Sequence, residues 1–156
     1  MTNYQKAMLV TLTIAAFDGL RKTTEPDSAA YTRLVRAIKK QLRLMDLYRH
    51  EAWPQSKLSK ASAILDEYQD KLHALAGHIQ YEDNFQAMLQ LALAAFETIR
   101  ADEVPKTTIY LKLNSAIDYL IELLSIFTPG GCPNSISNAA GDLVDDYVIR
   151  IKQVFV

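Results

Sequence analysis

Ala87-Met-Leu-Gln-Leu-Ala-Leu-Ala-Ala-Phe-Glu-Thr-Ile-Arg100 is the stretch that decides the fold, because the chain carries a close copy of it at positions 7–21. When the chain is aligned with itself at an offset of 79 residues, Phe17 matches Phe96 and the two halves share 16 identities in 77 pairs without a gap. Self-similarity at one fixed offset is typical of a tandem duplication. We therefore expect two homologous units, residues 1–77 and 80–156.

Apolar residues recur at helical spacing in both units, and proline or serine precedes several of these stretches. The stretches 3–22 and 83–101 contain few strongly polar positions, which is typical of buried helices, so we expect them at the centre. Short connections predict that sequential helices pack as antiparallel neighbours. The sequence predicts an all-α six-helix bundle of two tandem three-helix units with approximate internal two-fold symmetry, folded as one domain over 1–156. The remaining helices are expected at about 26–49, at about 56–77, after Pro105, and from about 135 onward.

The composition is that of an ordinary globular protein, with 49% apolar and 22% charged residues. The single cysteine, Cys132, excludes an intrachain disulfide framework. The first residues lack the layout of a signal peptide, and no apolar run reaches the roughly 20 residues that a bilayer requires. We expect a cytoplasmic protein without a membrane-spanning segment.

The net charge of −1 hides an asymmetry between the two units. Residues 1–77 hold 12 Lys/Arg against 8 Asp/Glu, whereas residues 78–156 hold 5 against 10. Opposite signs favour docking of the two units on each other or head-to-tail association between molecules. A homo-oligomer is therefore possible.

A stripe of basic residues lies opposite the apolar face of the helix expected at 26–49. The same positions in the second unit carry Lys112, Ser115, Asp118, Tyr119 and Glu122, so the stripe is not required by the architecture. It is either a solvated helix face or a docking face for an acidic partner, which could be the second unit, another protein or nucleic acid. The candidate partner-binding residues are Arg33, Arg36, Lys39, Lys40 and Arg43, with Leu47 as a nearby apolar contact.

Signals for catalysis or metal binding are weak. His73 and His78 are five residues apart and do not share one helical face, so we expect no metal site and no cofactor. A catalytic or small-ligand pocket between the two units would require Arg100, Asp145 and Tyr147 to meet at a buried polar cavity. Trp53, beside a proline, is expected to cover one end of the bundle.

The function that these patterns favour is a non-enzymatic protein–protein interaction module, such as an adaptor, a chaperone or a regulator. Its expected partner is another protein with an acidic surface. The alternatives are a nucleic-acid-associated regulator that uses the basic stripe, and a small-ligand-binding bundle with a pocket between the units.

Overall fold

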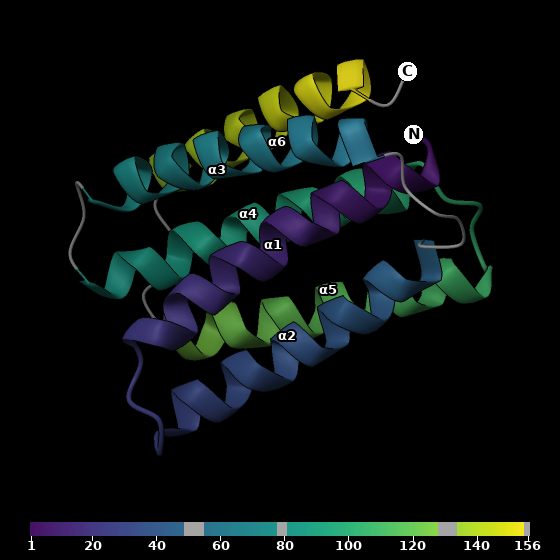
Figure 1. The fold of residues 1–156 in the computed structure, drawn as a ribbon. Helices are drawn as coiled ribbons and strands as arrows, with labels where there is room; N and C mark the ends of the chain where they lie inside the picture. The colour runs from purple at the N-terminus through teal and green to yellow at the C-terminus, as the bar shows by residue number, and fades with distance from the viewer. Residues whose placement is uncertain (49–54, 78–80, 128–133, 155–156) are drawn as a thin grey trace.

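The structure is a computed structural model that describes residues 1–48, 55–77, 81–127 and 134–154. Trp53 and Cys132 therefore lie outside the described residues, and the expectation for Trp53 stays a prediction. Over the described ranges the chain is all-helical, as the periodicity predicted (Figure 1). The six helices are α1 (Asn3–Thr23), α2 (Ala29–Tyr48), α3 (Gln55–Gly77), α4 (Tyr81–Ala101), α5 (Thr108–Phe127) and α6 (Asn134–Val154).

Side-chain caps set where several helices begin. The Thr2 hydroxyl accepts the N–H of Gln5, and the Gln5 side chain accepts the N–H of Thr2, which forms a capping box before α1. The expected start of the second helix at Pro26 is wrong by three residues, because the hydroxyl oxygen of Ser28 accepts the N–H of Tyr31 and α2 begins at Ala29. In the same way, Thr107 caps α5 by accepting the N–H of Tyr110.

The helices lie in three layers of two (Figure 1). α1 and α4 form the middle layer, between the pair α2 and α5 on one side and the pair α3 and α6 on the other. Phe17 of α1 and Phe96 of α4 are both completely buried. This confirms the expectation that these two helices occupy the centre, because a middle helix has neighbours on both sides and buries apolar residues on most of its faces.

Each layer pairs one helix of the first half with the helix three places later in the chain, and the two run antiparallel (Figure 1). The prediction that all sequential helices are neighbours is wrong for two connections. In the described part of the chain, α2 does not contact α3 and α5 does not contact α6. The reason is that the members of these two pairs belong to opposite outer layers, with the middle layer between them.

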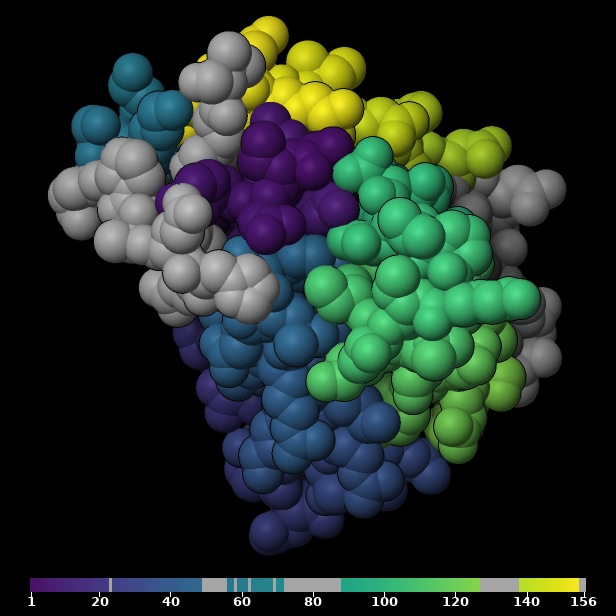
Figure 2. Space-filling view, turned by 90° about the vertical axis from the view of Figure 1, so that its right-hand side faces the viewer, coloured from purple at the N-terminus to yellow at the C-terminus, as the bar shows by residue number. Residues whose placement is uncertain are grey.

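Two further observations concern the whole fold. No helix in the described ranges is long and apolar enough to cross a bilayer. Viewed from the end where α1 begins, the first residues of the chain are surrounded by segments of α2, α6 and the region after α4 (Figure 2). This packing places polar side chains of α1 against residues far away in the sequence.

Candidate functional site

The basic stripe of α2 is divided between solvent and the contact with α5. Arg36, Lys39 and Arg43 are exposed, whereas Arg33 and Lys40 are half-buried. Leu47, the nearby apolar contact, is also half-buried and packs against the core. The stripe is therefore a largely solvent-facing cationic surface, and its half-buried members, Arg33 and Lys40, lie beside α5.

Tyr119 of α5 contacts both half-buried residues of the stripe. The ammonium Nζ of Lys40 lies 4.9 Å from the centroid of the Tyr119 ring, a cation–π contact. The Tyr119 hydroxyl donates a hydrogen bond of 3.3 Å to the backbone carbonyl oxygen of Arg33. One aromatic side chain thus holds both the backbone of α2 and the position of the Lys40 charge.

At one end of the α2–α5 contact the surface is hollowed into a groove of about 250 Å³. Its cationic residues come from both helices, and Leu44 and Ala116 form its apolar floor. Within the described ranges, no carboxylate lies within ion-pair distance of Arg43 or Lys112. The lining residues are Lys40, Arg43, Leu44, Lys112, Ser115 and Ala116.

Lys112 and Ser115 are members of this site that sequence reasoning missed as binding residues. In the internal alignment they correspond to Arg33 and Arg36, which are two residues of the basic stripe. The sequence places them only on the diverged copy of the stripe. The pairing of α2 with α5 brings the two corresponding faces together, and no local pattern predicts that contact.

The other end of the same contact carries mixed charge. Burial is the main cause that raises the pKa of the Tyr119 hydroxyl; Glu122 also raises it, whereas Arg36 and Arg33 lower it. All three charged groups therefore lie close enough to Tyr119 to act on it.

A second hollow of about 360 Å³ borders α2 and is lined by Pro26, Tyr31, Thr32, Val35, Arg36 and Lys39.

A water-sized void of about 10 Å³ lies beneath Lys40 and Tyr119, and Gln41 is part of its lining. Gln41 is only 2% exposed. Its Oε1 atom lies 3.0 Å from the Thr13 hydroxyl oxygen, while its Nε2 atom has no hydrogen-bond partner among the described residues. A buried amide donor without a partner is destabilising, so this position is energetically unusual for a bundle core.

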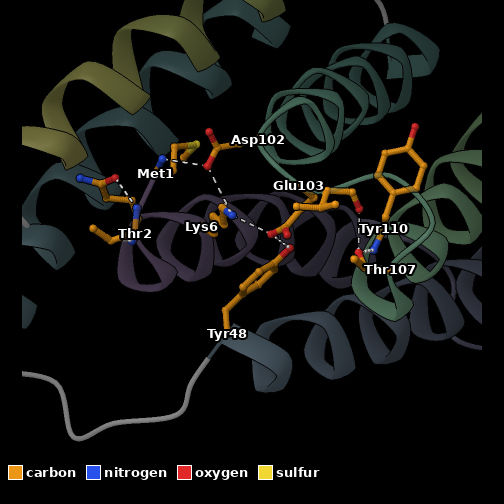
Figure 3. A network of polar contacts seen from close by, with 10 residues as sticks. Met1, Thr2, Lys6, Tyr48, Asp102, Glu103, Thr107 and Tyr110 are labelled. Carbon is orange, nitrogen blue, oxygen red and sulfur yellow. Dashed lines mark hydrogen bonds and ion pairs between the residues drawn. The ribbon is translucent and has the colours of Figure 1, made fainter.

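A separate polar network joins the start of α1 to the ends of α2 and α4 (Figure 3). The Lys6 ammonium lies 2.6 Å from Oε1 of Glu103 and 3.3 Å from Oδ2 of Asp102. The Tyr48 hydroxyl donates a hydrogen bond of 3.0 Å to the same Glu103 oxygen, and the amino group of Met1 lies 2.8 Å from Asp102 Oδ2. Because Lys6 is 6% exposed, this is a mostly buried ion pair and not a surface one.

Two pKa shifts reflect this network. The hydrogen bond from the terminal ammonium is the main cause that lowers the pKa of Asp102, with a further contribution from Lys6. Burial is the main cause that raises the pKa of Tyr48, and its hydrogen bond to Glu103 acts in the same direction. Tyr48 therefore stays a neutral donor to Glu103, and Asp102 stays a charged acceptor for Met1 and Lys6.

Arg100, Asp145 and Tyr147, the residues that a pocket between the units would require, each have a different environment. Arg100 donates a hydrogen bond to Asn114, and the Tyr147 hydroxyl donates one to the carbonyl oxygen of Met8. Asp145 is exposed, and none of the three residues lines the hollows described above. Likewise, no group of three or more His, Cys, Asp or Glu side chains in the described ranges could hold a metal ion.

Comparisons with known proteins give no assignment: no family model matches the chain, and neither a curated protein nor a solved structure matches it.

Proposed function

We propose that the chain is a non-enzymatic protein–protein interaction module, such as an adaptor, a chaperone or a regulator, whose partner presents an acidic surface. The observation that carries the proposal is the cationic face of α2 and its extension onto α5. Its exposed members Arg36, Lys39, Arg43 and Lys112 have no carboxylate partner within the described ranges. Charge that is not neutralised within a protein is available to complement a partner of opposite sign.

We also propose that the two halves arose by tandem duplication and pack with approximate two-fold symmetry. Reciprocal contacts support this. At the offset of 79 residues, Glu67 corresponds to Asp146 and Lys71 to Arg150. The ion pairs Glu67–Arg150, at 3.1 Å, and Lys71–Asp146, at 3.8 Å, therefore exchange equivalent positions, as a two-fold axis requires.

Contacts between equivalent residues point the same way. The rings of Tyr68 and Tyr147, which correspond in the alignment, pack edge-to-face with centroids 5.2 Å apart. Lys40 and Tyr119, which form the cation–π contact between α2 and α5, also correspond to each other. A residue can contact its own equivalent only near a symmetry axis, so one axis through all three layers accounts for both contacts.

The test of the interaction function is co-purification from native cell extract with nuclease added, comparing two charge-matched double variants. We expect wild-type protein to retain a stoichiometric protein partner and the variant Lys39→Glu/Arg43→Glu to lose it. The control, Lys60→Glu/Lys152→Glu, changes the net charge equally at exposed positions outside the α2 face and should keep the partner.

Equal loss in both variants, or no partner with either, would contradict the proposal. A bound species that disappears on nuclease treatment and depends on Lys39 and Arg43 would favour the nucleic-acid alternative instead. Binding of that kind should also weaken steeply with salt concentration, because phosphate contacts release counterions. The single cysteine suits a reducing compartment, and we propose the cytoplasm as the setting.

A further inference from the structure

We propose that the groove between α2 and α5 binds a phosphoryl group carried by a side chain of the acidic partner; the partner itself rests on the proposed function. Three cations border this one groove, Lys40 and Arg43 from α2 and Lys112 from α5, beside the hydroxyl of Ser115. These four groups are donors, and the groove lining includes no carboxylate.

The two ends of the α2–α5 contact differ in a way that isolates this groove. In the internal alignment, Arg43 corresponds to Glu122. Near Tyr119, Glu122 stands with Arg33 and Arg36, so positive and negative charges are mixed at that end. At the groove, arginine occupies the corresponding position, and the charged residues of the lining are all cations. The groove lining therefore carries positive charge alone, whereas the end near Tyr119 also presents a carboxylate.

The number of cations favours a phosphoryl group over a single carboxylate. A carboxylate carries one negative charge, whereas a phosphorylated side chain carries about −1.5 to −2 at pH 7 and offers three acceptor oxygens. Arginine can donate two parallel hydrogen bonds to such a group, and lysine acts as a point charge beside it. Lys40 is already held by the ring of Tyr119, which reduces the entropy lost when it binds.

The open position of the groove favours a phosphoryl group presented by a larger partner. Arg43, Lys112 and Ser115 are all exposed. Pockets that retain free small molecules generally bury most of the ligand surface, and a hollow of about 250 Å³ between two exposed helix faces does not enclose one. A macromolecule gains the missing contact area from the adjoining cationic face of α2.

The decisive experiment is a calorimetric titration of the full chain with two synthetic acidic peptides that differ at one central position, phosphoserine in one and glutamate in the other. We expect the phosphopeptide to bind about tenfold more tightly at pH 7.5, the size of effect that added charge-assisted hydrogen bonds give. The advantage should shrink at pH 5.5, because the second phosphoryl proton binds with a pKa of about 6. Backbone NMR shifts should locate the peptide on α2 and α5.

Variants at the two ends of the helix pair provide the matched control. Arg43→Ala and Lys112→Ala should each weaken phosphopeptide binding about tenfold. Arg36→Ala removes the same charge from the cationic face outside the groove, so it should weaken both peptides alike and leave the preference for the phosphopeptide unchanged. All three positions are exposed. Unchanged thermal unfolding will therefore confirm that the fold is retained.

The outcomes separate this inference from the proposed function. If both peptides bind equally well, or if Arg36→Ala reduces the preference for the phosphopeptide as much as Arg43→Ala does, the phosphoryl site is refuted while a general acidic-partner surface stands. If neither peptide binds and co-purification also fails, both proposals fall. Free O-phosphoserine that binds as tightly as the phosphopeptide would overturn the assignment to a partner side chain.

Discussion

Gln41 is a polar residue at a buried position where the second half of the chain has an apolar residue. The Thr13 hydroxyl lies 2.7 Å from the carbonyl oxygen of Val10 and 3.0 Å from Gln41 Oε1, but a hydroxyl has one proton and serves one of these acceptors at a time. In the internal alignment, position 41 corresponds to Leu120, which lines the same void. The second half therefore shows which side chain the architecture accepts at this place.

We predict that Gln41→Leu stabilises the protein by about 1 kcal/mol, which corresponds to a rise of about 3 °C in Tm for a chain of this size. The physical reason is that the variant removes a buried amide whose Nε2 has no partner, while Thr13 keeps its bond to Val10. Thermal and urea unfolding measure the change.

The reverse substitution at the corresponding position is the control. Leu120→Gln buries a new amide and should destabilise the protein by about 3 kcal/mol. A loss of stability in Gln41→Leu comparable to that in Leu120→Gln would contradict the prediction, because it would mean that the Gln41 amide is fully hydrogen-bonded.

At the scale of helices, the Lys6–Glu103 ion pair ties the start of α1 to the end of α4, and Tyr48 adds the end of α2. The side chains of Lys6 and Glu103 are only 7% and 14% exposed. Breaking a buried pair leaves an uncompensated charge, so we expect Lys6→Met to destabilise the protein by about 3 kcal/mol. Urea unfolding monitored by circular dichroism provides the measurement.

The double variant Lys6→Met/Glu103→Gln identifies the cause of that loss. It removes the uncompensated charge and keeps an acceptor for Tyr48, so it should recover about 2 kcal/mol relative to Lys6→Met alone. Lys22→Met serves as the surface control, because Lys22 is 69% exposed in its pair with Asp18 and should matter by less than about 0.5 kcal/mol. A double variant no more stable than Lys6→Met would show that packing, and not charge pairing, is lost.

At the scale of the whole molecule, ion pairs between the two halves follow the charge asymmetry of the sequence only in part. Lys6 pairs with Asp102 and Glu103, which joins a cation of the first half to acids of the second. In the outer layer of α3 and α6 one ion pair has the reverse arrangement: Glu67 of the first half supplies the acid, and Arg150 of the second half supplies the cation. Local pairing at the seam, and not net charge alone, therefore connects the halves.

The seam between α3 and α6 should make stability depend on pH. The hydrogen bond from Arg150 is the main cause that lowers the pKa of Glu67 in the folded protein. A lowered pKa means that the contribution is fully present above the unfolded value, about 4.3, and is lost as the pH falls through the folded pKa. We therefore predict that Glu67→Gln has a lower Tm than wild type at pH 7, and that the difference shrinks as the pH falls below about 4.3.

Asp142→Asn provides the matched control for this pH dependence. Asp142 is an exposed carboxylate on α6 with no ion-pair partner among the described residues. Its Tm should follow that of wild type across the same pH range. A constant Tm difference for Glu67→Gln from pH 7 to pH 3 would show that the carboxylate charge is not responsible.

Sequence alone determined the helices and their division between centre and surface. The 3.6-residue periodicity is a local property of each stretch, and apolar residues on most faces of 3–22 and 83–101 predicted a buried middle layer. The basic residues of α2 were also evident, because a charged stripe opposite an apolar one can be read from a single helix. The helix starts were less certain: Pro26 suggested one at a turn, whereas the Ser28 hydroxyl provides the actual cap.

Only the tertiary structure decided which faces meet. Lys112 and Ser115 become part of the candidate site because α2 packs against α5, and Lys6 reaches Glu103 across 97 residues of sequence. Leu47 is half-buried and packs against the core, which includes residues of several helices. Contacts of this kind depend on how layers stack, which a local periodicity does not encode. The sequence therefore determined the elements, and packing between distant segments produced the groove.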